Sequence, residues 1–266
     1  MVALNGQWTP LAFVLALAWP TLASAADTIT GLIDGNYAYS RVRVKPVIDS
    51  DQYTAHASLL YTFDNPGFAV QLEGSDDFYF AVKHKLAHLW SAGGDVFWRD
   101  GKGTIGLSAS FFSTDAPVSP FFAKEEQIGS YGFFGEYYAF DDLTLQMRGG
   151  GTTGATGQAS LYGAGGLTYY DSPDLAFHTE MNFSAYTSGQ DWTNVNSGVE
   201  YLPFGSIPLS FYAGYDWTNI SSGGTASTFF GGIKIHFGSG RRLVDYQRGG
   251  PAEWTGIAAP GAGLKF

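Results

Sequence analysis

Short segments with strictly alternating character recur along most of this chain. In residues 53–63, YTAHASLLYTF, every odd position is apolar, whereas Thr, His and Ser occupy most even positions. Residues 208–218, PLSFYAGYDWT, alternate in the same way. Because successive side chains of a β-strand point to opposite sides, each segment makes a strand with one apolar face and one small or polar face. The repetition of this pattern predicts an all-β chain.

The segments and the stretches between them predict twelve strands, with ten or fourteen as alternatives. We place the strands near residues 31–41, 52–63, 67–75, 86–98, 103–112, 129–140, 143–151, 158–170, 174–186, 193–202, 208–218 and 226–237. Short connections rich in Asp, Asn, Gly and Pro, residues suited to tight turns, alternate with longer and more irregular ones. The short turns are expected at 64–67, 99–102, 141–142, 171–174 and 204–207. The longer loops are expected at 42–51, 76–85, 113–128, 152–157, 187–192 and 219–225.

Amino-acid composition distinguishes two classes of β-protein that contain such strands, one soluble and one in contact with lipid. A secreted β-sandwich or soluble barrel also alternates, but its outer face is charged. Only 14% of the residues here are charged, against about 25% in ordinary globular domains. Glycine, serine, threonine and asparagine fill most of the non-apolar face, and aromatic residues gather near strand ends. These features favour an apolar face that contacts lipid and a polar face that lines an interior.

The last alternating segment carries a family resemblance. In residues 225–237, TASTFFGGIKIHF, the combination of Gly232, Ile233, Ile235 and Phe237 resembles the closing strand of bacterial outer-membrane β-barrels. The resemblance implies a transmembrane, antiparallel up-and-down β-barrel of about twelve strands. It also implies that the barrel-assembly machinery recognises residues 226–237 as its sorting signal.

The N-terminal residues look like an export signal. Residues 11–19, LAFVLALAW, are apolar but too short to cross a bilayer, and Ala23, Ser24 and Ala25 form a small-residue cleavage site. We expect a signal peptide over 1–25, a barrel over 26–237 and a Gly/Pro-rich periplasmic tail over 238–266, in the outer membrane. No Lys or Arg precedes the apolar run, which departs from the usual signal pattern. The cleavage site has no cysteine, so we expect no lipoprotein anchor.

The face opposite the apolar one gives the candidate lumen residues. They are Asp34, Glu73, Asp95, Glu136, Arg148, Glu180, Glu200, Asp216 and Lys234. Seven acids against two bases leave a net charge of −5, which favours cations over anions in an open pore. The alternative is that these charges pair across the lumen and only hold the structure together. The acidic balance of the whole chain, −10, argues against a nucleic-acid partner.

A basic stretch follows the first expected strand. Arg41, Arg43 and Lys45 continue its lipid-facing side just above the aromatic level, where the phosphates of lipopolysaccharide lie. Lys83, His84 and Lys85 form a second basic patch. Both stretches could equally be solvated loops.

The tail breaks the alternating pattern. Residues 238–266 are rich in Gly and Pro, and their side chains sum to +2. Such a segment could fold back and plug an acidic lumen, bind a periplasmic partner or stay disordered.

Together these features predict a porin-like channel for passive diffusion of small neutral or cationic solutes. A closed structural or adhesion barrel that presents its loops is the alternative, and an outer-leaflet lipid-modifying enzyme comes third. Phospholipase and deacylase barrels place catalytic groups near the outer surface, where this chain offers His88 without a serine motif. Acidic-sugar porins line their lumen with arginine, and an autotransporter carries a large passenger, so we expect neither class. We expect no catalytic residue, no cofactor and no metal site.

Overall fold

The computed structural model describes residues 29–43, 48–63, 67–81, 85–114, 126–154, 159–187, 191–205, 207–221, 224–238 and 240–252. The predicted signal peptide, Lys45, the Lys83 and His84 pair and residues 253–266 lie outside these ranges. Among the described residues, no helix is both long and apolar enough to cross a bilayer.

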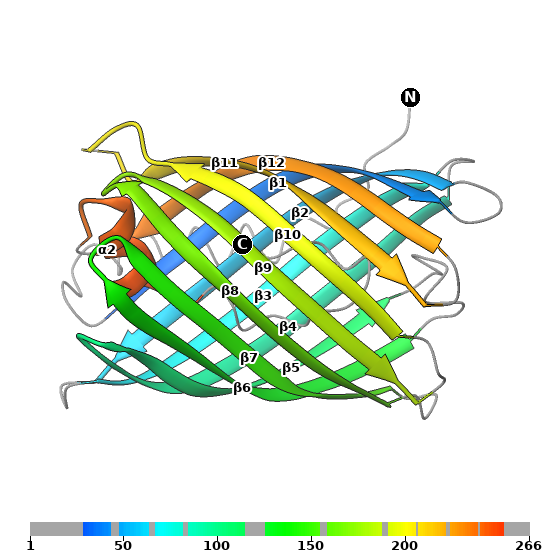
Figure 1. The fold of residues 1–266 in the computed structure, drawn as a ribbon, viewed down its shortest axis with the longest axis horizontal. Helices are drawn as coiled ribbons and strands as arrows, with labels where there is room; N and C mark the ends of the chain where they lie inside the picture. The colour runs from blue at the N-terminus through cyan, green and yellow to red at the C-terminus, as the bar shows by residue number, and fades with distance from the viewer. Residues whose placement is uncertain are drawn as a thin grey trace, which may run out of the picture.

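Twelve antiparallel strands form a closed barrel, which confirms the predicted fold class and strand number (Figure 1). The strands are β1 (Ile29–Arg43), β2 (Ile48–Thr62), β3 (Phe68–Ala81), β4 (Lys85–Asp100), β5 (Gly103–Thr114), β6 (Glu126–Phe140), β7 (Leu143–Gly154), β8 (Ala159–Ser172), β9 (Leu175–Tyr186), β10 (Asp191–Tyr201), β11 (Leu209–Ile220) and β12 (Gly224–Phe237). Each strand pairs with its neighbours in sequence, and β1 pairs with β12 to close the ring. A short helix, α2 (Leu243–Gly249), follows the last strand.

The pairing of β1 with β12 closes the ring in a regular register. β1 and β12 pair from Gly31 opposite Phe237 to Arg43 opposite Thr225, with Asp34 opposite Lys234. A slip of β12 by one residue would turn the Lys234 side chain toward the outer surface. The alternating pattern of the sequence and the hydrogen-bond register of the structure therefore agree.

The two faces of the wall differ as the alternation predicts. Outward side chains such as Leu161, Ile105 and Phe229 are exposed by 70%, 67% and 62%, whereas Lys234 and Glu200 on the inner face are exposed by only 1%. An apolar outer band of this extent suits a hydrocarbon environment, and burial of the charged face inside the ring protects it from lipid. The wall thus matches the architecture of an outer-membrane β-barrel.

The interior also holds aromatic side chains, which the alternation alone does not reveal. Phe97 and Phe134 pack at a ring-centroid distance of 5.8 Å, next to Leu60 and Ala69. Gly106 lies beside both rings, where a Cβ atom would come within 2.5 Å of Phe97 Cβ and 2.6 Å of Phe134 Cζ. Part of the interior on this side is therefore filled rather than open.

The short connections gather at one end of the barrel, which we call the short-turn end. At the β4–β5 turn, Asp100 Oδ1 accepts hydrogen bonds from the backbone N–H groups of Lys102 and Gly103, the local bonding expected of an Asp turn. Gly67 before β3 has φ of +99°, and a Cβ atom there would lie 2.6 Å from the carbonyl oxygen of Arg99. The turn residues thus match the conformations they adopt.

Most strands extend further than predicted toward the opposite end, which carries the longer loops. β3, for example, continues to Ala81, although residues 76–85 were predicted to form a loop. The pairing continues because backbone hydrogen bonds do not depend on the apolar pattern that marks the lipid-facing part of a strand.

Candidate functional site

All nine predicted lumen residues lie on the inner face of the ring. Six of them are buried, namely Asp34, Asp95, Glu180, Glu200, Asp216 and Lys234. Glu73, Glu136 and Arg148 are partly buried. The structure also brings Asp77 and Arg99 to this face, at the ends of β3 and β4. Neither residue was predicted to line the lumen, because the sequence pattern places Asp77 in a loop and Arg99 in a turn.

One group of lumen residues forms a ladder of hydrogen bonds across β7, β9, β10 and β11. Arg148 Nη2 donates to Glu180 Oε1 at 2.8 Å and to Asn182 Oδ1 at 2.9 Å. Asn182 donates to Asn194, and the Asn194 amide in turn donates to Asp216. The Arg148 guanidinium on β7 therefore binds two side chains of β9, and the ladder continues across β10 to a second carboxylate on β11. This is the ion-paired arrangement that the structural alternative for these charges predicts.

A second group surrounds Glu200. Lys234 Nζ lies 2.9 Å from Glu200 Oε2, and Ser210 Oγ donates to Glu200 Oε1 at 2.5 Å. His236 Nε2 lies 3.0 Å from Ser210 Oγ and 3.4 Å from Glu200 Oε1. His178 Nε2 is 4.0 Å from the other carboxylate oxygen. We call these five residues the Glu200 cluster.

The Glu200 cluster contains a serine, a histidine and a glutamate, but not in a hydrolytic arrangement. In a catalytic triad the acid holds the histidine nitrogen opposite the one that faces the serine. Here Glu200 and Ser210 both approach Nε2 of His236, and Glu200 itself accepts the serine proton. The carboxylate therefore holds the hydroxyl in place instead of supporting the base. Ser210 is also fully buried.

A third group lies across β1, β2 and β3. His56 Nδ1 lies 2.7 Å from Asp34 Oδ2, and its Nε2 is 3.9 Å from Glu73. Tyr212 donates to the other oxygen of Asp34 at 3.3 Å. Toward the loop end of the same wall, Asp77 accepts hydrogen bonds from Thr54 at 2.5 Å and from Gln52 at 3.2 Å. Acidic groups therefore occur at several heights of the inner wall.

No group of three or more His, Cys, Asp or Glu side chains within the described ranges is placed to hold a metal ion.

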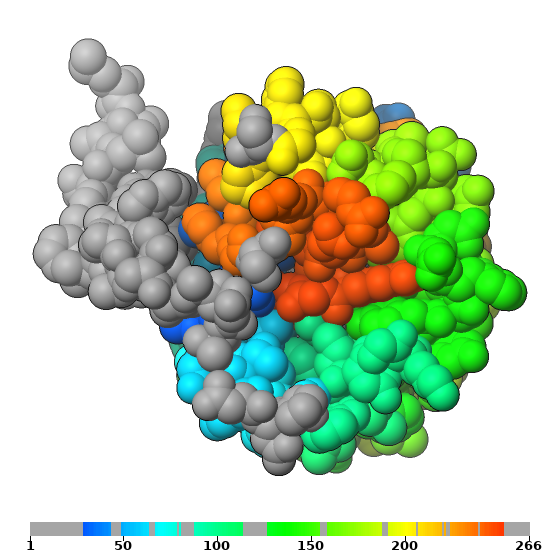
Figure 2. All heavy atoms as spheres, turned by 90° about the vertical axis from the view of Figure 1, so that its left-hand side faces the viewer, coloured from blue at the N-terminus to red at the C-terminus, as the bar shows by residue number. Residues whose placement is uncertain are grey.

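Residues 240–252, which we call the strap, follow β12 at the short-turn end and lie across the mouth of the barrel there (Figures 1 and 2). Figure 2 faces this end and shows the orange-to-red strap framed by the ends of the strands. The sequence pattern left open whether residues 238–266 fold back, bind a partner or stay disordered. For residues 240–252 the structure shows a folded-back segment, which includes α2.

The first part of the strap is anchored on the β8–β11 side of the mouth. Leu243 is fully buried against Tyr170, Ala176 and Leu202. Its backbone N–H donates to Asp174 Oδ1, and the next N–H donates to the carbonyl oxygen of Pro173. This contact fixes the start of α2 on the turn between β8 and β9.

The polar side chains of α2 reach into the barrel. Gln247 Nε2 donates to Glu200 Oε2 at 3.0 Å and lies 3.5 Å from His178 Nε2. The ring of Tyr246 stacks on His236 with a centroid distance of 4.7 Å. The strap thus completes the Glu200 cluster from the mouth side.

Arg248 joins the strap to the β6–β8 side. Its guanidinium donates to Thr144 and to the carbonyl oxygen of Phe140. It also lies 4.9 Å and 5.3 Å from the ring centroids of Tyr138 and Tyr170, a cation–π arrangement.

The far end of the strap reaches β3 and β4. Gln71 and the backbone of Ala252 exchange two hydrogen bonds, of 2.9 and 2.7 Å. Arg99 donates to the carbonyl oxygen of Gly250 at 2.7 Å. Since Leu243 is held at β8–β11 and Ala252 at β3, the strap bridges the mouth from one wall to another.

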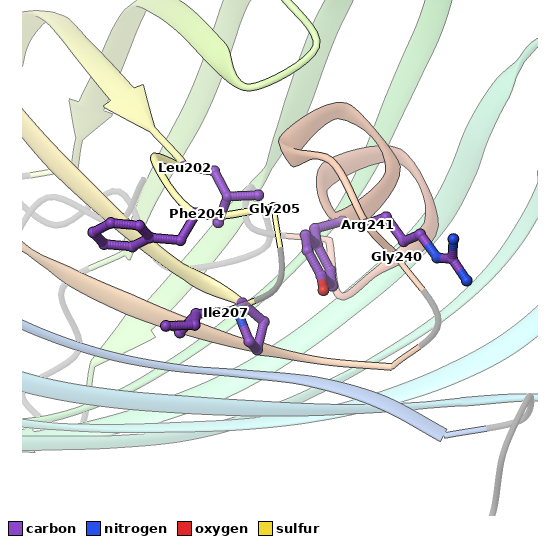
Figure 3. A pocket seen from close by; sticks show the side chains of 8 residues that line it. Leu202, Phe204, Gly205, Ile207, Gly240 and Arg241 are labelled. Carbon is purple, nitrogen blue, oxygen red and sulfur yellow. The ribbon is translucent and has the colours of Figure 1, made fainter.

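A cavity of about 330 Å³ lies beside the strap at the β10–β11 turn. Its lining includes Leu202, Phe204, Ile207, Pro208, Arg241 and Tyr246. In Figure 3, Phe204 and Ile207 lie on one side of it, and the Arg241 side chain extends away from them. The strap is therefore not tightly packed against this turn.

Of the residues predicted to contact lipopolysaccharide, Arg41 and Arg43 lie on the outer wall at the loop end. Arg41 is exposed and pairs with Asp49 at 3.1 Å, and Tyr39 donates to the same carboxylate. Arg43 is also exposed. His88, on the outer wall, pairs with Asp76 and stacks on Phe78. The outer rim thus carries both signs of charge, and the lipopolysaccharide contact stays a prediction.

Neither a protein-family model nor a curated protein sequence matches the chain. Solved structures do match its fold. An outer-membrane channel from Pseudomonas putida F1 has a TM-score of 0.59 at 7% identity, covering 80% of this chain and 96% of the channel. The translocator domain of the autotransporter NalP from Neisseria meningitidis has a TM-score of 0.51 at 11% identity, covering 85% of this chain and 95% of that domain.

The β-domain of the Bordetella autotransporter BrkA also has a TM-score of 0.51, at 10% identity, covering 79% of this chain and all of that domain. At such identities the likeness is one of fold, and the fold is shared by proteins of different function. The chain is a 12-stranded β-barrel of the outer-membrane type that resembles both outer-membrane channels and autotransporter β-domains.

Proposed function

We propose that this barrel is an outer-membrane channel for passive diffusion of small neutral or cationic solutes. The observation that carries the proposal is the contrast between the two faces of the closed wall. The outer face is apolar, whereas the inner face carries polar and acidic side chains at several heights. A barrel that only had to be filled would not need this many ionisable groups inside, since each one costs desolvation energy.

The charge of the inner face supports a preference for cations. Arg148 and Lys234 each pair with one glutamate, so neither base offers an unpaired positive charge to an anion. On the described inner wall, acids outnumber bases: Asp77 adds one acid and Arg99 one base to the predicted set, so the excess of five acids is unchanged. Acidic groups along a pore lower the free energy of cations relative to anions.

The rest of the proposal concerns export and surroundings. A cleaved signal peptide over residues 1–25 would direct the chain across the inner membrane, and the 226–237 strand would present the sorting signal to the barrel-assembly machinery. The longer loops would face outside, with Arg41, Arg43 and Lys45 near lipopolysaccharide. The strap and the short turns would then face the periplasm.

Liposome swelling tests the channel directly. Proteoliposomes that carry the full chain, or a Leu243→Asp variant in which a charge displaces the strap, should swell in neutral sugars at rates that fall as the sugar grows. An amino sugar should enter faster than a sugar acid of the same size. If neither protein admits any solute although both are folded, the barrel is closed, and the loop-presenting alternative replaces the channel.

A further inference from the structure

We infer that the strap is a gate that closes the short-turn mouth when it is docked and opens the channel when it is released. This inference rests on the proposed channel function and adds its regulation. The strap lies across the mouth, and it is held by contacts on opposite walls rather than by continuation of the sheet. A segment attached in this way can leave without disturbing the β1–β12 closure.

The helix within the strap depends on docking. α2 has only seven residues, and isolated helices shorter than about 12 residues are marginal in water. Its N-cap residue, Arg242, makes no side-chain capping bond, and the first N–H groups of the helix are satisfied instead by Asp174 and Pro173 of the wall. Release from the wall should therefore also unfold α2, giving two discrete states, a docked helix and a released coil.

Several of the contacts that hold the strap are hydrogen bonds, which can be exchanged with water. Gln247, Arg248, Gln71 and Arg99 supply these hydrogen bonds. The apolar contacts come from the buried Leu243, Pro251 and Ala252 and from the partly buried Val244 and Tyr246. The cavity beside Tyr246 shows that packing at the β10–β11 turn is incomplete. Segments held in this way open locally at a low free-energy cost, and the moving parts of gates are usually segments of this kind.

The chain also has a suitable pivot. Gly238 directly follows β12 and has φ of +122°, a conformation that glycine adopts without strain. Gly240 lies two residues further on, before the strap reaches its first anchor at Leu243. Rotation at these glycines would swing the strap away from the mouth while β12 stays paired.

The test measures potassium efflux from proteoliposomes that carry full-length protein. Leu243→Asp places a charge in the apolar anchor, and Gln247→Ala removes the bond to Glu200. We expect efflux to rise about tenfold in Gln247→Ala, since one net hydrogen bond corresponds to roughly that factor, and further in Leu243→Asp. Arg241→Ala is the matched control, because the Arg241 side chain is exposed and extends away from Phe204 and Ile207 on the opposite side of the cavity. Its efflux should equal that of the wild type.

A locking experiment complements the opening variants. The chain has no cysteine, so a bifunctional thiol reagent acts only at an introduced pair. In His178→Cys/Gln247→Cys, which joins the wall to the strap, crosslinking should reduce efflux several-fold, and a cleavable linker should restore it on reduction. A difference in gel migration between the unheated and the heated protein confirms that every variant is a folded barrel.

The outcomes separate the gate from the channel. If all folded variants, locked or loosened, conduct as well as the wild type, the strap is not a gate and the channel stands. If no variant conducts, both proposals fall. Efflux that rises on loosening and falls on locking is what the gate requires.

Discussion

Replacing Lys234 by Met should destabilise the barrel because it leaves a buried carboxylate without its cation. Lys234 and Glu200 are each exposed by 1%, and their charged atoms lie 2.9 Å apart. Removal of one partner of a buried ion pair costs roughly 3–5 kcal/mol. Ser210 and Gln247 continue to donate to Glu200, so we expect the lower end of this range, about 3 kcal/mol.

Reversible urea unfolding in lipid vesicles, followed by tryptophan fluorescence, measures this change. With a denaturant slope of about 2 kcal/mol/M, the midpoint should fall by about 1.5 M. Glu200→Gln/Lys234→Met should recover most of the lost stability, since the glutamine amide is uncharged and leaves no unpaired charge in the buried site. A loss below about 1 kcal/mol for the single variant, or a double variant no more stable than the single one, would refute the reasoning.

Five further substitutions test three other parts of the structure. Phe134→Ala should lower the free energy of unfolding by about 3–5 kcal/mol in the same assay, because Phe134 is buried inside the ring. Phe133 faces outward, so Phe133→Ala should cost less than half as much. Equal costs would contradict the assignment of faces. Arg148→Gln should move the reversal potential in a KCl gradient toward the potassium equilibrium potential, and Asp77→Asn should move it the other way. If neither variant shifts the reversal potential, these side chains do not line the conducting path. Gly67→Ala should cost about 1–2 kcal/mol because of the φ of +99°, and an unchanged midpoint would show that the turn relaxes.

The barrel itself follows from the sequence because one physical requirement repeats in every strand. A wall between lipid and a polar interior requires apolar and polar side chains to alternate. The two faces of residues 53–63 and 208–218 can therefore be predicted from the sequence alone. The lumen positions then follow from strand parity. Lys234 and Asp216 could be placed inside for this reason alone.

The ends of the strands and the contacts between distant segments could not be predicted from the sequence in the same way. Beyond the lipid-facing band, alternation is no longer required, so Asp77 and Arg99 were assigned to connections although both lie on the inner wall. The helix α2 is hidden in a Gly/Pro-rich tail because its stability comes from Leu243 and Gln247 docking on the barrel, not from helix propensity. The partners of each lumen charge likewise depend on register, which composition does not encode.

The central claim is that the inner face conducts ions, and single-channel recording in planar bilayers tests it most directly. The refolded full-length protein and its Leu243→Asp variant should give discrete steps that scale with KCl concentration. In a KCl gradient the reversal potential should lie on the cation side of zero, with larger or more frequent steps in the variant. Absence of steps from both proteins, while each is shown to be folded, would contradict the account.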